Sequence, residues 1–451
     1  MEEPKSNNVL TSGSLLKGLV GLAGPMLASA LLQNLQTLID LFWVGKLGSD
    51  AVAALAMSGT ILMTLFPVII GMSTGTVALV SRFTGGERYD DAADVAGQSL
   101  LLAILMGLVS GLLGWFFAKD LLSLLGAREE VAHLGGQYLR IYFLGSFALY
   151  ILLMGSSIFQ GAGNTTVPMT AMVLATLLNL VLDPILIYGL FGAPRLEVRG
   201  AAVAAVISQA AAAIMVLAFL SRGSKVIKVH PTRWRLGQRA WRVLAIGLPS
   251  SGQLLLRSLM GLALMRIVAL SGTAAVAGYG IGLRFHMLIL IPAFSLGNSL
   301  STIVGQNLGA RRPDRAQAAS WLAVAIGVAI VVVSIAVLMV FARPLVRMFD
   351  HSPDVVRVGA GYLWIVSPVY VFAVLAIILG RALQGAGDTM APMVVTLVAL
   401  WGLQVPLAVV LSRVIHPSVV GIWCAIDLAT VVHGGLLAGW FQTGRWKRIE
   451  L

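Results

Sequence analysis

The 451-residue sequence has a single cysteine, Cys424, and only 11% charged residues. One cysteine excludes a disulfide within the chain and a metal site built from several cysteines. A soluble domain contains about 25% charged residues, so this composition is typical of a membrane protein. The N-terminus lacks the basic segment and small-residue cleavage site of a signal peptide, so we expect the first apolar segment to be retained.

Long apolar runs are what the sequence has in abundance, since 58% of its residues are hydrophobic. About twenty apolar residues are needed to cross the roughly 30 Å hydrocarbon core of a bilayer. Backbone groups in lipid must be satisfied within their own segment, so each run is expected to be a helix. We predict an all-α polytopic membrane protein with twelve transmembrane helices, at about 15–40, 51–80, 94–118, 131–159, 166–191, 199–221, 243–270, 275–304, 316–342, 355–382, 389–412 and 418–441.

The formal net charge of +12 is unevenly placed along this pattern. If the N-terminus is cytoplasmic, cytoplasmic segments hold 17 Lys and Arg and the opposite loops hold 9, with seven of the 17 in residues 222–242. The positive-inside rule therefore predicts a cell-membrane protein, of a bacterial inner membrane, with both termini in the cytoplasm. We interpret residues 222–242 as a basic cytoplasmic linker beside the membrane, and we expect no nucleic-acid partner.

The sequence matches itself after a shift of 224 residues, without a gap from Pro25 to about Met169. For example, FQGAGNTTVPM (Phe159–Met169) aligns with LQGAGDTMAPM (Leu383–Met393). An even number of helices separates the copies, so they are parallel repeats related by an axis along the membrane normal. We predict two pseudo-symmetric six-helix bundles, residues 1–221 and 243–451. Such a pair favours a transporter over a channel or an enzyme.

Charged side chains inside the predicted helices are candidates for function, because each costs roughly 2.5–3.5 kcal/mol near a helix centre. Arginine and aspartate are the residue types concerned. They are Arg140, Arg257, Arg266, Arg284, Arg381, Asp40, Asp183 and Asp427.

Asp40 differs from the others because polar residues precede it on one helical face. These residues are Gln33, Gln36 and Thr37, at seven, four and three positions before it. A second polar face in the fifth helix carries Asn179 and Asp183, four residues apart. Burial favours the protonated form of a carboxyl group, and a neighbouring carboxylate favours it further. The two aspartates therefore suit a site for a proton or for Na⁺.

The segments VGKLGSDAVAAL (Val44–Leu55), NLVLDPILIYG (Asn179–Gly189) and the paired QGAG-x-T-x-x-P turns resemble multidrug and toxic compound extrusion (MATE) transporters. The resemblance implies a twelve-helix, two-lobe antiporter that exports amphipathic, often cationic, drug-like compounds in exchange for H⁺ or Na⁺. It places the cation site on Asp40, Asn179 and Asp183. Bending of the first helix near Pro25 is expected to accompany protonation.

Two departures refine this resemblance. Family members often carry Thr where this chain has Ala205, and a missing oxygen ligand weakens Na⁺ coupling more than H⁺ coupling. The chain also has no acid in its seventh and tenth helices. It carries Arg257 and Arg266 in the seventh helix and Arg284 in the eighth, so it resembles the DinF-like branch more. We expect Arg257 and Arg284 to contribute to a substrate cavity, together with Gln33, Gln36 and Thr37. We therefore expect H⁺ as the coupling ion, no cofactor or bound metal, and a monomer.

Three alternatives stay open on the sequence. The first is Na⁺ coupling at the same residues. The second is a flippase for lipids or lipid-linked sugars, in which Arg257 and Arg284 hold a phosphate. The third is an intramembrane hydrolase using Ser73 of GMSTG. That motif needs a strand-to-helix turn and a His–acid pair, so we expect no enzyme.

Overall fold

The computed structural model describes residues 9–222 and 236–451, and every regular element within these ranges is a helix. The described chain forms two compact units. One comprises Gly21–Gly247, and the other comprises the residues up to Val20 together with Leu248–Leu451. The predicted lobes follow the sequence repeat, whereas these boundaries fall inside the first long helix of each repeat.

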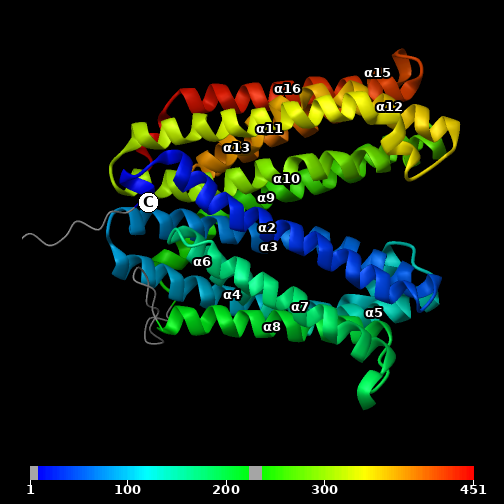
Figure 1. Ribbon diagram of the computed structural model, residues 1–451, viewed down its shortest axis with the longest axis horizontal. Coiled ribbons are helices and arrows are strands. Elements are labelled where there is room, and N and C mark those ends of the chain that lie inside the picture. The colour runs from blue at the N-terminus through cyan, green and yellow to red at the C-terminus, as the bar shows by residue number, and fades with distance from the viewer. Residues whose placement is uncertain (1–8, 223–235) are drawn as a thin grey trace, which may run out of the picture. The chain divides into compact units, whose positions relative to one another are not determined.

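The Gly21–Gly247 unit contains most of the first repeat (Figure 1). Its long helices run alongside one another, and α7 and α8 form one of its close helix pairs. In chain order the helices are α2 (Leu15–Gly45, which begins in the other unit), α3 (Ser49–Gly85), α4 (Tyr89–Leu124), α5 (Glu129–Leu144), α6 (Ser146–Gly161), α7 (Thr166–Tyr188), η1 (Leu190–Gly192) and α8 (Val198–Arg222).

The second unit opens with the short helix α1 (Val9–Ser12) and otherwise contains the second repeat. Here α10 packs against α11, α12 and α13, and α16 packs against α13 and α15. The helices are α9 (Gln238–Ala269, which begins in the first unit), α10 (Thr273–Gly309), α11 (Pro313–Arg347), α12 (Pro353–Val366), η3 (Ser367–Val369), α13 (Tyr370–Ala386), α14 (Met390–Thr396), the π-helix η4 (Leu397–Gln404), α15 (Val405–Val414), α16 (Ser418–Gln442) and η5 (Arg445–Arg448).

The prediction of twelve transmembrane helices is confirmed within the described ranges. Eleven spans are long and apolar enough to cross a membrane on their own. The twelfth is the pair α5 and α6, which are bent by 49° relative to one another. A single predicted span at 131–159 therefore corresponds to two helices joined at Gly145.

Gly145 lies at this bend for a steric reason. A Cβ atom built at Gly145 would lie 2.3 Å from a methyl carbon of Val206 on α8. Real side chains do not approach so closely, so only glycine allows α8 to pack against the bend. The close approach of the Val206 side chain to the α5–α6 bend accounts for the glycine at this position.

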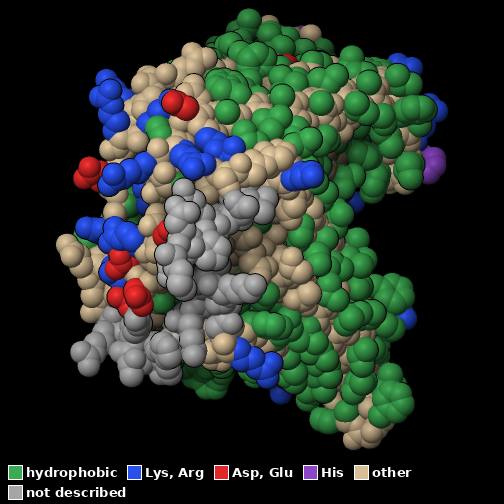
Figure 2. All heavy atoms as spheres, turned by 60° about the vertical axis from the view of Figure 1, so that its left-hand side comes forward, with side chains coloured by type: hydrophobic (Ala, Val, Ile, Leu, Met, Phe, Trp, Pro, Cys, Tyr) green, Lys and Arg blue, Asp and Glu red, His purple; other side chains and the backbone are tan. Residues whose placement is uncertain are grey.

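The surface has the distribution expected of a protein surrounded by lipid. Apolar side chains of α4 such as Leu112, Trp115 and Phe116 are exposed. Figure 2 shows hydrophobic side chains over much of the visible surface, with most of the visible Lys, Arg, Asp and Glu side chains in the left-hand part of the view. Exposed apolar surface of this extent is stable in contact with lipid but not in contact with water.

The predicted linker, residues 222–242, is only partly described, because residues 223–235 lie outside the described ranges. Its last residues already belong to α9, which begins at Gln238. The seventh predicted helix therefore starts five residues earlier than residue 243.

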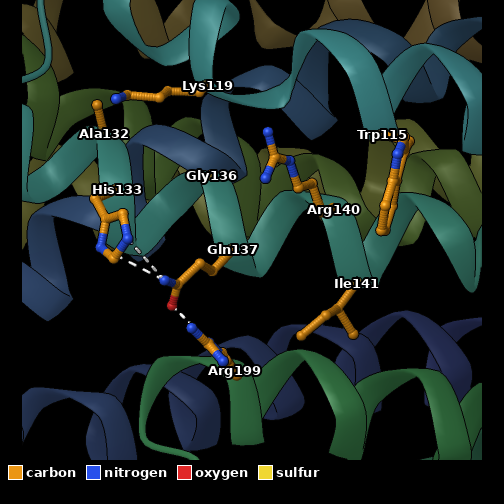
Figure 3. A pocket seen from close by; sticks show the side chains of 9 residues that line it. All are labelled: Trp115, Lys119, Ala132, His133, Gly136, Gln137, Arg140, Ile141 and Arg199. Carbon is orange, nitrogen blue, oxygen red and sulfur yellow. Dashed lines mark hydrogen bonds between the residues drawn. The ribbon is translucent and has the colours of Figure 1, made fainter.

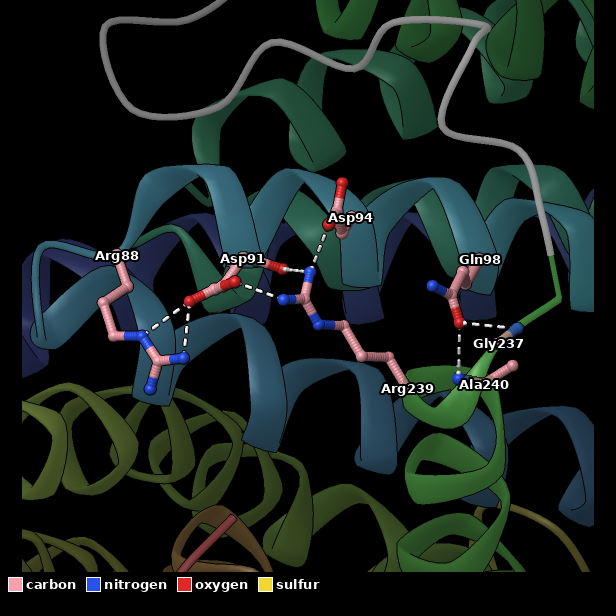
Figure 4. Close-up of polar contacts among 7 residues, drawn as sticks. All are labelled: Arg88, Asp91, Asp94, Gln98, Gly237, Arg239 and Ala240. Atoms are coloured by element: carbon pink, nitrogen blue, oxygen red, sulfur yellow. Dashed lines mark hydrogen bonds and ion pairs between the residues drawn. The ribbon is translucent and has the colours of Figure 1, made fainter.

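The start of α9 is attached to the start of α4 by polar contacts (Figure 4). The guanidinium of Arg239 forms ion pairs with both Asp91 and Asp94. The side-chain oxygen of Gln98 accepts hydrogen bonds from two backbone N–H groups at the start of α9, at 2.7 and 3.2 Å. Part of the basic charge of the predicted linker is thus neutralised within this unit.

Candidate functional site

Asp40 of α2 and Asp183 of α7 meet in the Gly21–Gly247 unit. Their carboxyl groups are close enough to share a hydrogen bond if one of them is protonated. Asp183 is fully buried and Asp40 is half-buried. Asn179, one turn before Asp183 and also fully buried, donates from Nδ2 to Asp183 Oδ1 at 3.2 Å. The structure therefore brings the three residues predicted to bind the coupling cation into one cluster.

A hydrogen bond between the two carboxyl groups requires a proton. Asp40 Oδ1 and Asp183 Oδ2 are buried, and neither has a hydrogen-bond partner within the described chain. An ionised carboxylate only accepts hydrogen bonds, whereas a protonated one has an O–H that donates. One carboxylic acid donating to one carboxylate satisfies both groups, and two carboxylates at this contact would repel one another.

Two further hydrogen bonds join α2 to α7, one on either side of the carboxyl pair. The Thr165 hydroxyl, just before α7, donates to the carbonyl of Leu22 at 3.2 Å. The Tyr188 hydroxyl, at the end of α7, donates to the carbonyl of Trp43 at 2.5 Å. Close backbone packing is found between α7 and α8. Besides these hydrogen bonds, an edge-on contact between the Trp43 and Tyr188 rings joins α2 to α7, with centroids 6.1 Å apart. A change in the charge of the carboxyl pair therefore acts on one of several contacts between the two helices.

Two tyrosines that sequence reasoning missed lie near the pair. Tyr138 and Tyr142 of α5 are buried, their rings stack with centroids 5.9 Å apart, and both lie within electrostatic range of Asp40. Gln209 of α8 donates to the Tyr142 hydroxyl at 3.1 Å. Their spacing of four residues on one helical face was the available signal, but apolar packing explains that spacing equally well.

The other polar residues of the predicted α2 stripe are not brought to the carboxyl pair. Gln33 and Thr37 are exposed, and the Thr37 hydroxyl donates to the Gln33 carbonyl of its own helix at 3.2 Å. Gln36 is half-buried. Pro25 lies inside α2, and its carbonyl accepts a hydrogen bond from the Ser29 hydroxyl at 2.9 Å.

The two arginines predicted for a substrate cavity have different surroundings. Arg284 of α10 is exposed, and its guanidinium lies 5.5 Å from the centroid of the Phe349 ring. Arg257 of α9 is half-buried and lies within electrostatic range of Arg381. The structure thus gives no contact that unites Arg257 with Arg284.

A separate pocket of about 320 Å³ opens on α4, α5 and the start of α8 (Figure 3). Its wall is basic and partly aromatic, and the Arg140 guanidinium lies 6.0 Å from the centroid of the Trp115 ring. The lining residues are Trp115, Lys119, Ala132, His133, Gly136, Gln137, Arg140, Ile141 and Arg199. Arg140, one of the charged candidates, therefore lines this pocket, whereas the residues predicted for the cation site do not.

These features define a multi-pass membrane transporter, not an enzyme, that acts on small molecules in a setting consistent with the plasma membrane. The MatE family model matches residues 25–185 and 249–410, the two sequence repeats. The chain therefore belongs to the MATE family. The resemblance seen in the sequence is confirmed at the level of the family.

Named relatives cover almost the whole chain. The probable multidrug resistance protein YoeA of Bacillus subtilis is 28% identical over 437 residues, which are 95% of this chain and 93% of that protein. An FAD transporter of Shewanella oneidensis is 29% identical, with 88% of each chain covered. A solved structure of a MATE protein in the bent conformation is similar with a TM-score of 0.91 at 25% identity, covering 97% of this chain and 98% of that one.

Proposed function

We propose that the protein is a multidrug efflux antiporter that exports amphipathic, often cationic, compounds in exchange for protons. The observation that carries the proposal is the contact between the carboxyl groups of Asp40 and Asp183. It supports a proton-binding pair, because one oxygen of each group, Asp40 Oδ1 and Asp183 Oδ2, is buried without a hydrogen-bond partner in the described chain. Relatives named as multidrug resistance proteins support the choice of cargo.

Proton release would weaken the attachment of α2 to α7. With one proton the pair is held by a hydrogen bond to a charged group, worth about 1.5–3 kcal/mol. Without it, two charges about 4 Å apart repel by about 4 kcal/mol at an effective dielectric constant of about 20. The pair therefore titrates as a unit, and its contact belongs to the protonated state.

Coupling to cargo follows from this difference between the two states. A drug that binds better to the deprotonated form must promote proton release, and a proton must lower drug affinity by the same factor. Pro25 lies at the start of the α2 segment that would move, and a proline weakens the helix locally. We further propose cytoplasmic termini, the DinF-like branch, no cofactor, and function as a monomer in a bacterial inner membrane.

The test uses protein reconstituted into vesicles, with ethidium as the transported probe. The wild-type protein should accumulate ethidium when a pH difference is imposed, and Asp40→Asn and Asp183→Asn should reduce accumulation to background. Asp120→Asn is the matched control because this acid is exposed near the end of α4. Gradient-driven accumulation by Asp40→Asn would refute the proposal.

Na⁺ coupling at the same place is the second candidate. The observation in its favour is that Thr176 Oγ1 and Asn179 Oδ1, on the same face of α7, are buried without hydrogen-bond partners. Oxygen ligands of this kind suit Na⁺ as well as a proton. A Na⁺ gradient imposed at equal pH on both sides discriminates the two, since the proposal expects no accumulation under that condition.

A further inference from the structure

A buried chain of polar side chains crosses the Leu248–Leu451 part of the second unit. Arg381 donates to Gln384 Oε1 at 3.0 Å, and Gln384 Nε2 donates to Gln253 Oε1 at 2.8 Å. Gln253 Nε2 then donates to the Thr396 hydroxyl at 3.0 Å, which lies 3.3 Å from His433 Nε2. The chain joins α13, α9, α14 and α16, and it leaves the arginine at one end without an acidic partner.

Arg257 lies one helical turn after Gln253 on the same face of α9. It is within electrostatic range of Arg381, His286 and His433. Within the described ranges the structure gives Arg257 no hydrogen bond or ion pair. The indole N–H of Trp401 donates to the carbonyl of Leu256 at 2.9 Å, which fixes the α9 backbone beside it.

Arg381 is also held in place. A Cβ atom at Gly297 of α10 would lie 2.9 Å from the Arg381 side-chain stem, so the glycine provides the space through which this side chain passes. Its guanidinium is oriented by the hydrogen bond to Gln384. Two guanidinium groups are therefore presented by fixed helices, and a planar guanidinium binds phosphate or carboxylate oxygens in pairs.

Among the described residues of this unit, no acid forms an ion pair with Arg257 or Arg381. Asp427, on α16, lies within electrostatic range of Tyr362, Tyr370 and Cys424. Asp388 accepts a hydrogen bond from the Trp440 indole at 2.9 Å. Two like charges within a membrane-spanning region are costly unless an anion offsets them.

The sequence repeat shows that the two arginines, Arg257 and Arg381, occur in the second half of the chain only. The positions equivalent to Arg257 and Arg381 in the first repeat are Gln33 and Ser157, both neutral. Gln384, by contrast, aligns with Gln160. The second repeat has thus kept the glutamine and acquired two positive charges beside it.

We propose that Arg257 and Arg381 form a binding site for the anionic group, phosphate or carboxylate, of an amphipathic molecule. The proposal extends the proposed function by giving the transporter's second half a cargo class of its own. Gln384, itself held by Gln253 and through it by Thr396, positions Arg381. The anionic group comes from a transported solute or from a phospholipid headgroup, which share this chemistry.

The test compares two probes that share an aromatic body and differ in charge, 1-naphthyl phosphate and 1-naphthylmethylammonium. Binding to the full-length protein in phosphatidylcholine nanodiscs is measured by calorimetry at one pH and without a gradient. We expect the phosphate to bind at least tenfold more tightly, since a charge-assisted pair of hydrogen bonds is worth at least that factor.

Variants locate the site. Arg257→Gln and Arg381→Gln should each weaken phosphate binding about tenfold or more, and Arg257→Lys should recover part of the loss. Arg266→Gln is the matched control, since Arg266 is an exposed arginine on the same helix. Equal affinity for the two probes, or unchanged phosphate affinity in well-folded Arg257→Gln, would overturn the proposal.

Two additional experiments are needed. The first distinguishes a transported solute from a phospholipid headgroup as the source of the anionic group, and the second distinguishes the anion-site proposal from the proposal of proton coupling. Competition by phosphatidylglycerol in the nanodisc assigns the site to a lipid headgroup, and its absence assigns the site to a solute. Asp40→Asn should still bind naphthyl phosphate although it loses proton-driven transport. Failure of proton coupling is therefore distinguishable from failure of the anion site.

Discussion

Replacing Asp183 by Asn isolates the effect of the proton on the contact between α2 and α7. The amide of Asn donates a hydrogen bond at every pH, so it imitates the protonated acid permanently. In the wild-type protein, loss of the proton introduces about 4 kcal/mol of repulsion between Asp40 and Asp183, or roughly a thousandfold change in the population of the contact. The contact should therefore depend on pH only in the wild-type protein.

The sign of this dependence follows from which form makes the contact. At low pH the pair holds one proton and α2 is attached to α7. As the pH rises and the proton leaves, the attachment weakens and α2 moves or becomes mobile. Asp183→Asn should keep the attached arrangement from low to high pH and should not export ethidium under a pH difference.

Distances between spin labels measure this directly. The labels are placed at Leu38 on α2 and Ile214 on α8, whose side chains are 63% and 67% exposed. Cys424, the protein's single cysteine, is first replaced by Ser so that only these sites react. Distance distributions from pulsed electron resonance are then compared at acidic and alkaline pH.

The wild-type distribution should shift with pH, and the Asp183→Asn distribution should match the acidic wild-type one at both extremes. Asp120→Asn, which removes an exposed acid of α4, should behave like the wild-type protein. A wild-type distribution that does not change with pH would refute the reasoning. So would a distribution in Asp183→Asn that shifts as the wild-type one does.

Two predictions concern stability. Arg239→Gln removes the ion pairs that attach the start of α9 to α4, and because these groups are partly exposed it should lower the free energy of unfolding by about 1–2 kcal/mol, less at high salt. Gly145→Ala forces a methyl group against α8 and should cost about 1–3 kcal/mol, whereas Gly21→Ala, with open space at its Cβ position, should not destabilise. Denaturation of the purified variants, followed by circular dichroism, measures all three, and equal stability of the two glycine variants would contradict the steric argument.

The transmembrane spans could be predicted from the sequence for two reasons. The bilayer thickness sets the length of each span, and backbone groups in lipid must form their hydrogen bonds within the same helix. The break at Gly145 could not be predicted, because it depends on the approach of Val206 from another helix. The unit boundaries near Val20 and Gly247 also escaped prediction. A sequence repeat marks where the chain was duplicated, whereas compactness depends on which residues pack together.

The carboxyl site could be predicted from the sequence because charged residues are rare in transmembrane helices. Asp40 and Asp183 stand out in apolar helices, and the structure brings them into contact, while their function stays a prediction. Gln253 and Gln384 were not singled out, because a neutral amide in a helix becomes informative only when its partner is known. Their pairing joins helices more than a hundred residues apart in sequence.

The first long helix of each repeat carries a charged side chain within its apolar span, Asp40 in α2 and Arg257 in α9. In both repeats, polar side chains help to attach this helix to its neighbours. In the first unit, α2 is joined to α7 by the carboxyl pair and by hydrogen bonds from Thr165 and Tyr188. In the second, α9 is joined to α14 and η4 by Gln253 and Trp401. Apolar packing does not respond to protons or anions, whereas a hydrogen bond to a charged group changes by kilocalories per mole. Under the two proposals, these polar contacts allow a proton to alter the position of α2 and an anion to alter the position of α9.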